Sequence, residues 1–290
     1  MRNVSWLFLL SIVVCTVLTS CQPESAQKQL APEPRYLLEE FTSEEVGQLL
    51  LAGELQTAVI TAGSTEQHGK HLPLASDALA ADWLGKEITK ALGKAVLCPV
   101  LRVGDSRHHM KFPGTLTLQP ETLRAVLRDM AESLVTHGFR EVIILPTHGG
   151  NFAAVGEVAA SMQQKYPERT ILGYADVLRF VQVSSKVAAS LGVSAGEAGA
   201  HAGETETSIN LAIRPDLVRL ARREAGYMKP LDEKQLQRVF REGIHAVSPN
   251  GVLGDPAKAS AEHGRTYLDA LKQHLLEWIA EERKKHAAAM

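Results

Sequence analysis

The sequence predicts an α/β fold, arranged as a single three-layer α/β/α domain with a mostly parallel central sheet. Short apolar runs alternate along the chain with longer amphipathic stretches, which is the order expected when helices follow successive strands. The short runs are apolar at nearly every residue, as in strands that are covered on both faces. Aromatic residues make up only 5% of the chain, which argues against an all-β sandwich.

The expected elements follow from these runs in chain order. The predicted strands span residues 57–62, 95–103, 141–146 and 170–174. The predicted helices span residues 77–92, 120–137, 152–166, 181–191, 208–213, 232–242 and 259–285. The helix over 120–137 is the best defined, because Pro120 stands at its start and Gly138 follows its end. Asp77 is expected to cap the first of these helices.

The composition is that of a soluble globular protein. Hydrophobic residues make up 45% and charged residues 22% of the 290 residues, enough for one large α/β domain with a sizeable core. The chain has 31 lysines and arginines against 33 aspartates and glutamates, so its formal net charge is −2. This balance, with no basic run in the sequence, gives no reason to expect a nucleic acid as a partner.

The beginning of the chain has the pattern of a lipoprotein signal peptide. Arg2 is followed by an apolar run over residues 6–18, which is too short to cross a bilayer as a helix but typical of a signal peptide. The run ends in Leu18-Thr19-Ser20-Cys21, which resembles a bacterial lipidation site. The alternative is a plain secretory signal in which Cys21 is incidental.

The predicted organisation is therefore a signal peptide over 1–21, a flexible polar tether over 22–35 and one domain over 36–290. Lipidation of Cys21 would hold the mature protein at a membrane, as an exported lipoprotein of the cell envelope that faces the periplasm or the cell exterior. Cys98 is then the one cysteine of the domain, so the domain has no internal disulfide.

Three polar segments carry the residues suited to chemistry, over 63–77, 147–151 and 200–208. The first two directly follow predicted strands, and open parallel sheets bind their ligands beyond the carboxyl ends of the strands. Their imidazole and carboxylate groups suit Zn, Mn or Fe(II), and a carboxylate can bridge two metals. Each segment alone is equally compatible with a turn, a capping loop or a helix start, so the conjunction of the three predicts a metal site.

Six short segments match one known family in the same order. They are Gly63-Ser64-Thr65-Glu66-Gln67-His68-Gly69, His71-Leu72-Pro73-Leu74 with Asp77, Phe112-Pro113-Gly114-Thr115, His148-Gly149-Gly150-Asn151, His201-Ala202-Gly203-Glu204-Thr205-Glu206-Thr207-Ser208 and Gly251-Val252-Leu253-Gly254-Asp255-Pro256. By these motifs the chain resembles the creatininase family of metal-dependent amidohydrolases over about residues 57–265. The spacing of Glu66, His68 and Asp77 is the specific part of the match.

The resemblance implies a creatininase-like parallel α/β/α fold with a dinuclear centre of Zn, Mn or Fe, with zinc as the first choice. Glu66 and His148 would bind one ion, His68 would bind the other, and Asp77 would bridge them. His201 would stand beside the substrate as an acid/base or an oxyanion-stabilising group. The resemblance also implies a homo-oligomer, because members of the family are commonly hexameric.

One departure from creatininase concerns the second metal ion. Creatininase has a glutamate two residues after the histidine that matches His148, where this chain has Gly150. Glu204 is the natural replacement, as in the branch of the family that carries both His-Gly-Gly-Asn and His-Ala-Gly-Glu. Creatininase also covers its substrate with tryptophans between the third and fourth motifs, which this chain lacks, so creatinine is not the expected substrate.

The resemblance leads to the hypothesis of metal-dependent hydrolysis of an amide C–N bond, cyclic or formamide-like, in a small molecule. Glu206 or Asp77 would orient the attacking water, and His201 would stabilise the oxyanion or protonate the leaving nitrogen. Two alternatives stay open, a membrane-tethered binding protein without catalysis and a peptidase that acts at the end of a peptide. Three further histidines lie near the motifs and could line the pocket or be solvated: His71, His108 and His109.

Overall fold

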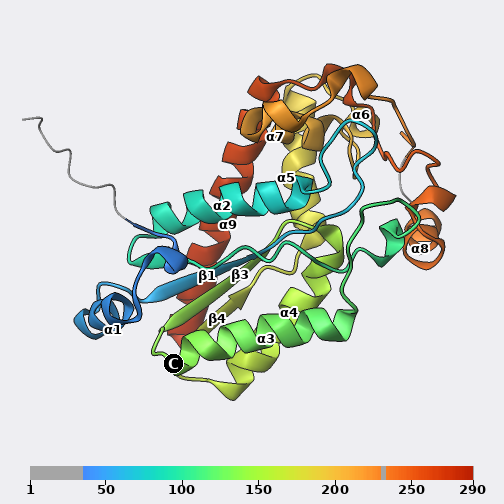
Figure 1. Cartoon of the computed structure of the whole chain (residues 1–290). Coiled ribbons are helices and arrows are strands. Elements are labelled where there is room, and N and C mark those ends of the chain that lie inside the picture. Colours follow the sequence, from blue (N-terminus) through green and yellow to red (C-terminus); the bar gives the residue numbers. More distant parts are fainter. Residues whose placement is uncertain (1–34, 230–232, 290) are drawn as a thin grey trace, which may run out of the picture. The chain divides into compact units, whose positions relative to one another are not determined.

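The computed structural model describes residues 35–229 and 233–289. The predicted signal peptide, Cys21 and nearly all of the predicted tether therefore lie outside the described residues. Four strands form one parallel sheet in the order β2-β1-β3-β4 (Figure 1), which confirms the predicted fold class. Their bounds are β1 Thr57–Ala62, β2 Ala95–Leu97, β3 Glu141–Pro146 and β4 Thr170–Gly173.

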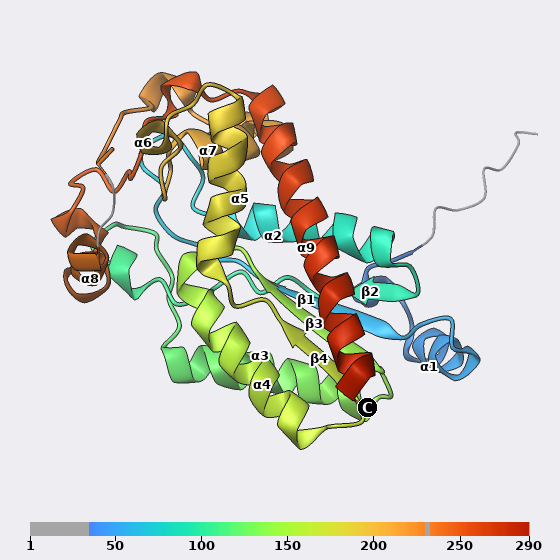
Figure 2. The ribbon, with the colours of Figure 1, turned by 180° about the vertical axis from the view of Figure 1, so that it is seen from behind.

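Helices bury their apolar residues in two separate cores, one on each face of the sheet. The first core receives α1 Ser43–Ala52, α3 Pro120–Thr136 and α4 Phe152–Lys165. The second receives α2 Ser76–Leu92, α5 Val177–Ser190, α6 Ala195–Ala198, α7 Glu204–Ile213 and α9 Ala261–Ala289. Figure 2 shows α5 and α9 side by side, and α8 Glu233–Glu242 lies apart from them. Over 35–229 and 233–289, no helix is long and apolar enough to cross a membrane.

The strands supply side chains to both cores because successive residues of a strand point to opposite faces. In β1, Ala58 and Ile60 belong to the core with α3 and α4, whereas Val59 belongs to the core with α2 and α9. Every residue of β1 and β3 is buried. Coverage on both faces is therefore the physical reason for the continuous apolar runs in the sequence.

The strand predicted over 95–103 is shorter in the structure. β2 ends at Leu97, and Leu101 forms only an isolated bridge with Ala62. Pro99 lies between them and has no N–H with which to continue the ladder. The chain thus leaves the sheet at Pro99 and pairs with β1 once more at Leu101.

The starts of two helices also differ from the prediction. α5 begins four residues earlier than expected, at Val177, and α7 begins at Glu204 instead of residue 208. α1 is absent from the helices predicted from the sequence, although it begins with a capping box. The Thr42 hydroxyl accepts a hydrogen bond from the Glu45 N–H, and the Glu45 carboxylate accepts one from the Thr42 N–H.

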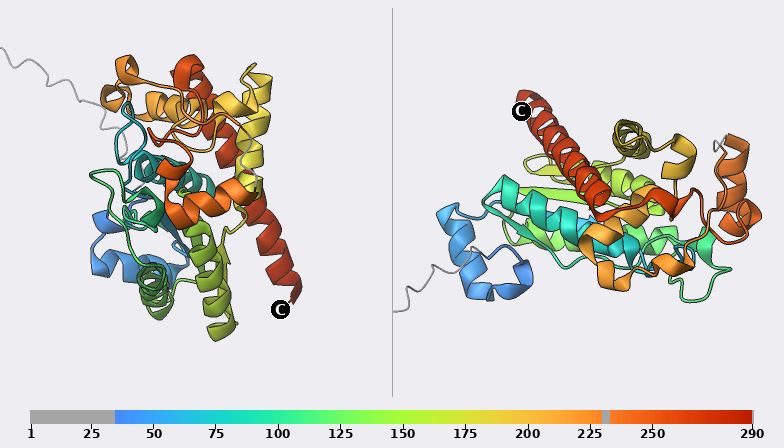
Figure 3. Two further views of the ribbon diagram at one scale, coloured as in Figure 1. Left: turned by 90° about the vertical axis from the view of Figure 1, so that its right-hand side faces the viewer. Right: turned by 90° about the horizontal axis from the view of Figure 1, so that it is seen from above.

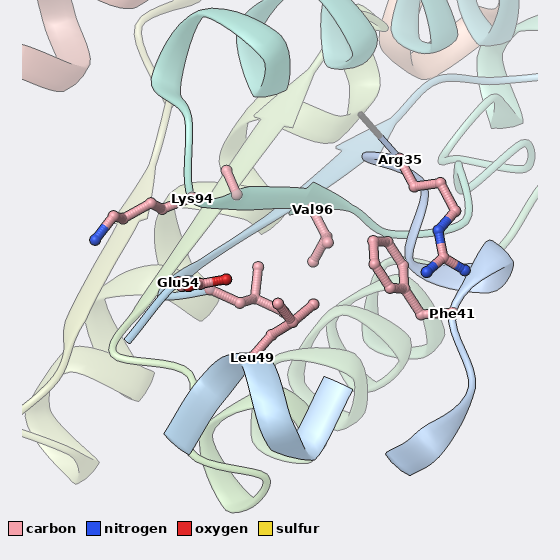
Figure 4. A pocket seen from close by; sticks show the side chains of 8 residues that line it. Arg35, Phe41, Leu49, Glu54, Lys94 and Val96 are labelled. Carbon is pink, nitrogen blue, oxygen red and sulfur yellow. The ribbon is translucent and has the colours of Figure 1, made fainter. Parts of the chain in front are cut away.

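A surface cavity of about 330 Å³ lies beside the amino ends of β1 and β2 (Figure 4). Its lining residues are Arg35, Phe41, Leu49, Glu54, Leu55, Lys94, Ala95 and Val96. Its two cations have partners within the fold, since Arg35 donates to the Glu45 carboxylate and Lys94 donates to the Gly53 carbonyl. The cavity is at the opposite edge of the sheet from the polar loops.

The amino edge of the sheet is tied to α9 through a buried carboxylate. Glu141 opens β3 and accepts hydrogen bonds from the Thr57 hydroxyl at 2.7 Å and from Arg283 Nε at 2.8 Å. A second guanidinium nitrogen of Arg283 also donates to this carboxylate. Arg283 and Glu141 thus form a bidentate ion pair, which fixes the relative orientation of the two side chains as well as their distance.

We expect Arg283→Met to lower the free energy of unfolding by about 1–2 kcal/mol, because it leaves the Glu141 carboxylate buried without its cation. The value is below that of a fully buried pair because 39% of the Arg283 side chain is exposed. Urea unfolding measures the change. Lys285→Met on the same helix is the matched control, since its pair with Glu282 is exposed and should contribute almost nothing. Equal effects of the two substitutions would contradict the prediction.

Candidate metal centre

The polar segments meet at the carboxyl edge of the sheet. β1 and β3 are parallel neighbours, so the segments that follow them leave the sheet at the same edge (Figures 1 and 3). Glu66 and His68 lie in the segment after β1, and His148 follows β3. The prediction that Asp77 caps α2 is wrong. Ala75 holds the N-cap position, and Asp77 lies in the first turn with its carboxylate directed at the two histidines.

Three groups of side chains could each hold one metal ion, and two of them share Asp77. Of these two, the first group is Glu66, Asp77 and His148, and the second group is His68, Asp77 and Glu206. The remaining group, Glu66, His68 and His201, takes one residue from each of them and adds His201. His148 Nδ1 lies 3.3 Å from Asp77 Oδ2 and 3.4 Å from Glu66 Oε2. His68 Nε2 lies 3.4 Å from Asp77 Oδ1 and 3.6 Å from Glu206 Oε2. Ligand atoms ~2.1 Å from one tetrahedral zinc ion are roughly 3.4 Å apart, so both groups have a fitting spacing.

Several of these ligand atoms are buried without a hydrogen-bond partner. Within the described residues, Glu66 Oε2, His68 Nε2 and Asp77 Oδ2 make no hydrogen bond. A buried polar atom left unpaired costs about 1–3 kcal/mol, so three in one place indicate that a ligand completes them. Imidazole nitrogen and carboxylate oxygen suit Zn, Mn or Fe(II). The residues at this site therefore fit divalent metal ions.

Backbone carbonyl groups fix the orientation of the two histidines in these groups. His68 Nδ1–H donates to the Glu66 carbonyl oxygen at 3.1 Å, and His148 Nε2–H donates to the Asp105 carbonyl oxygen at 2.9 Å. When the ring is neutral, its other nitrogen carries the lone pair, and that nitrogen faces the carboxylates. Such a bond from the far ring nitrogen is the usual support of a metal-binding histidine.

Without a metal, protons take the place of the ions. Burial by itself lowers the pKa of His68, but the carboxylates of Asp77 and Glu206 raise it to about 10. Burial opposes the same effect at His148, where Glu66 and Asp77 raise the pKa to about 9. Burial also raises the pKa of Glu66 to about 7. The metal-free site is therefore held together by imidazolium–carboxylate attraction.

His201 lies against the two groups with its proton directed away from them. Its Nε2–H donates to the Gln67 carbonyl oxygen at 2.7 Å, so Nδ1 carries the lone pair. Nδ1 lies 3.8 Å from Glu66 Oε1 and 4.0 Å from Glu206 Oε2. Burial lowers the pKa of His201 well below its ordinary value, so the ring is neutral. A neutral proton acceptor thus stands beside the metal ligands.

The structure does not bring Glu204 to the second group. Its carboxylate accepts hydrogen bonds from Ser208 Oγ at 2.8 Å, His263 Nδ1 at 2.7 Å and Tyr267 Oη at 2.6 Å, which attaches α7 to α9. Glu206 lies at the second group instead. Residues two apart on a helix point roughly 200° apart, so the two glutamates of α7 cannot face the same site.

Glu206 is held in place by a strained residue. The Ala202 N–H donates to Glu206 Oε2 at 2.6 Å, and Ala202 has a positive φ of 52°. This left-handed conformation is unfavourable for alanine, and strain of this kind concentrates at functional sites. Glu206 is also the most exposed of the ligands, with 30% of its side chain accessible. Solvent therefore reaches the centre beside Glu206.

The three additional histidines have different places. His109 is buried with Nε2 3.3 Å from Glu66 Oε1, and His108 stacks on His148 with ring centres 5.8 Å apart. His71 is also buried, and its Nε2 pairs with Thr207 Oγ1 at 2.9 Å. The sequence analysis gave no role to Gln67, whose amide contacts both His109 and His201. Gln67 and His201 lie in matching motifs, but His109 lies outside them, so no motif indicated its contact with Gln67.

Gly150 cannot be replaced by a residue with a side chain in this arrangement. A Cβ atom there would lie 2.1 Å from the Asp105 carbonyl oxygen and 2.7 Å from His148 Nε2. Both atoms belong to the hydrogen bond that orients His148. The glycine is thus required for that bond, and a ligand for the second group has to come from another element.

Comparisons with known proteins agree with this geometry. The family described as creatininase, creatinine amidohydrolase, matches residues 39–279. A mycofactocin precursor peptide peptidase of Mycobacterium ulcerans (strain Agy99) is 35% identical over 215 residues, which cover 71% of this chain and 78% of that protein. A creatinine amidohydrolase of Pseudomonas putida is 27% identical over 261 residues, which cover 84% of this chain and 95% of that protein.

Solved structures give the same result for the fold. A mutant creatininase of Zn-Zn type has a TM-score of 0.71 and 25% identity, and the match covers 86% of this chain and 99% of that one. A putative creatinine amidohydrolase of Bacteroides fragilis NCTC 9343 has a TM-score of 0.61 and 24% identity, covering 79% and 90%. At 24% identity, the similarity to the Bacteroides fragilis structure concerns the fold alone.

We expect Glu206→Gln to weaken zinc binding and Glu204→Gln to destabilise the fold. Glu206→Gln removes a charged ligand of the second group, so its zinc affinity should fall by at least about 100-fold, since even the outer partners of ligands contribute 10–100-fold. Glu204→Gln should keep the metal but lower the free energy of unfolding by about 1–3 kcal/mol, because it weakens a buried charged network. Zinc titration and urea unfolding measure the two effects. Loss of zinc from a stably folded Glu204→Gln variant would show that the assignment is reversed.

Metal binding should depend steeply on pH. His68 and His148 have raised pKa values of about 10 and 9, so both hold protons near neutral pH that an ion must displace. The apparent zinc affinity of each group should therefore rise about tenfold per pH unit between about pH 7 and 8, and that of the first group more steeply below pH 7, where Glu66 is also protonated. Competition with a coloured chelator at several pH values measures it. An affinity that stays constant over this range would mean that the metal-free histidines are neutral.

Proposed function

The chain belongs to the creatininase family, and on this premise we propose that it hydrolyses an amide C–N bond with the help of two divalent metal ions. One observation carries the proposal: two ligand groups share Asp77, and three of their buried atoms, Glu66 Oε2, His68 Nε2 and Asp77 Oδ2, make no hydrogen bond within the described residues. Zinc is the first choice among Zn, Mn and Fe for imidazole and carboxylate ligands. When bound, two such ions would lower the pKa of a water and polarise the carbonyl of the substrate.

Each residue of the site has a distinct task in this proposal. Glu66 and His148 hold the first ion, His68 and Glu206 hold the second, and Asp77 joins the two groups. The side chains of Glu66, His68, Asp77 and His148 are almost fully buried, which keeps bulk water from competing with the substrate. The substrate approaches beside the partly exposed Glu206.

The hydrogen bond of His201 decides which of its two possible roles is supported. Nε2–H is bound to the Gln67 carbonyl, so the neutral ring presents only an acceptor, Nδ1, to the site. It can take a proton from the attacking water but cannot donate to an oxyanion before it has done so. The same Nδ1 can then give the proton to the leaving nitrogen. We therefore assign His201 as the general base and then the general acid.

The substrate is an amide that reaches the centre past Glu206, and a cyclic or formamide-like small molecule is the first candidate. A peptide bond is the second candidate. It is favoured by the 35% identity to a protein named mycofactocin precursor peptide peptidase. Creatinine is the least favoured, because this chain lacks the tryptophans noted above.

We also propose that the protein works as an exported lipoprotein held at a membrane by lipidated Cys21. The apolar run over 6–18 and the segment Leu18-Thr19-Ser20-Cys21 support this location. The resemblance to hexameric relatives supports a homo-oligomer.

The test is an activity screen of the chain lacking residues 1–21, loaded with zinc or manganese. Formamides, cyclic amides and short peptides are the three substrate classes. We expect hydrolysis in one class, a loss of about 100–10,000-fold in kcat with His201→Gln, and no activity in a Glu66→Ala/His148→Ala double variant. Elemental analysis should give close to two ions per chain in the wild type. A loaded protein that is inactive on all classes would favour the binding protein, and full activity of the double variant would exclude this centre.

A further inference from the structure

The side-chain amide of Gln67 lies between two histidines of the centre, and its orientation is fixed. The Gly69 N–H donates to Gln67 Oε1 at 3.0 Å, so the amino group of the amide points the other way. There it lies 3.2 Å from the Gly251 carbonyl oxygen, 3.0 Å from His109 Nδ1 and 3.1 Å from His201 Nε2. Three atoms thus lie within hydrogen-bond distance of the Gln67 amino group, which has only two hydrogens to donate.

Counting the protons resolves this competition. His201 Nε2 is itself a donor, because it lies 2.7 Å from the Gln67 carbonyl oxygen, and an oxygen of that kind can only accept. Two donors cannot bond to one another. The two hydrogens of the Gln67 amide therefore go to the Gly251 carbonyl oxygen and to His109 Nδ1. Every donor in the set then has one acceptor.

The count also places the proton of His109. Since Nδ1 accepts from Gln67, a neutral His109 carries its hydrogen on Nε2. Its Nε2 lies 3.3 Å from Glu66 Oε1, whereas the other oxygen of Glu66, Oε2, lies 3.4 Å from His148 Nδ1 in the first group. One carboxylate oxygen thus faces an N–H and the other faces the metal ligands.

We propose that Gln67 and His109 are positioning residues for the first metal ion. Gln67 holds the proton of His109 on Nε2, and that N–H orients Glu66 so that Oε2 is presented to the ion. His109 is therefore not a ligand, since its Nε2 has no free lone pair. The inference rests on the proposed function, because it needs a metal at the first group.

The Gln67 amide has little freedom to rearrange. Gly251 has a φ of +74°, and a Cβ atom at this position would lie 2.4 Å from Gln67 Oε1. Only glycine permits the amide to approach the backbone this closely. A purely structural role would make His109 a satisfied core residue whose loss destabilises the whole centre. A positioning role affects the first group alone.

The first test determines the position of the proton directly. Nitrogen-15 NMR of the metal-free protein, with the ring signals assigned by a His109→Gln spectrum, distinguishes the two tautomers. We expect the hydrogen of His109 on Nε2 in the wild type. Gln67→Glu offers an acceptor instead of a donor, so it should move that hydrogen to Nδ1. A wild-type hydrogen on Nδ1, or an unchanged tautomer in Gln67→Glu, would overturn the proposal.

The second test measures zinc binding at the two groups separately. His109→Phe should weaken the first group about 10–100-fold, the range typical of partners that orient metal ligands, and leave the second group within about threefold. His109→Gln should restore most of the affinity, because its amide N–H can reach the position of Nε2. His245→Phe, in the neighbouring 3-10 helix Ile244–Ala246, is the control for loss of a histidine and should change neither group.

The outcomes separate this inference from the proposed function. Equal weakening of both groups, or no rescue by His109→Gln, would show a merely structural role and overturn the positioning proposal. If the wild type binds no zinc at all, the proposed function fails. The tautomer measurement then still decides whether Gln67 controls the proton of His109, because it is made without metal.

Discussion

The metal centre depends on three backbone carbonyl groups that bind ring N–H groups of histidine. The carbonyl oxygens of Glu66, Gln67 and Asp105 accept from His68, His201 and His148. Each imidazole thus has one nitrogen bound to the main chain and the other directed at carboxylates. The fold places main-chain atoms directly, so the directions of all three rings are determined once the segments after β1, β2 and β3 and the segment before α7 are in place. The tautomers and the exclusion of a side chain at residue 150 follow from this constraint, whereas the neutral state of His201 follows from its burial.

The same constraint explains why the centre lies where it does. A parallel sheet covered on both faces offers main-chain groups for side-chain binding only at its edges, where the ladder ends. Asp77 can join both groups because α2 begins at that edge. Burial there makes unpaired carboxylates unfavourable, and the raised pKa of Glu66 reflects this cost. Protons on the histidines offset part of this cost in the metal-free site, and the proposed ions would offset it in their place.

Much of the fold could be predicted from the sequence for local reasons, and four of the candidate ligands could be expected from the resemblance of short motifs. β1 and β3 are continuous apolar runs, and the spacing of Glu66, His68 and Asp77 belongs to one short segment. Glu204 and Glu206 could not be told apart by motif alone, although the helical period separates their faces. Other features depend on contacts between distant segments. The roles of Gln67 and His109 need a neighbour about 40 residues away, and no local pattern encodes such a pairing.

α9 connects the two edges of the sheet. Near its start, His263 and Tyr267 bind Glu204 beside the centre, and near its end Arg283 binds Glu141 at the amino edge. A 29-residue helix is about 44 Å long, so these anchors lie far apart on one rigid element. Amide hydrogens at the amino edge and ligands at the carboxyl edge therefore belong to one cooperative folding unit. Occupation of the centre should slow hydrogen exchange at the far end of the sheet, through α9 and without any contact between the two places.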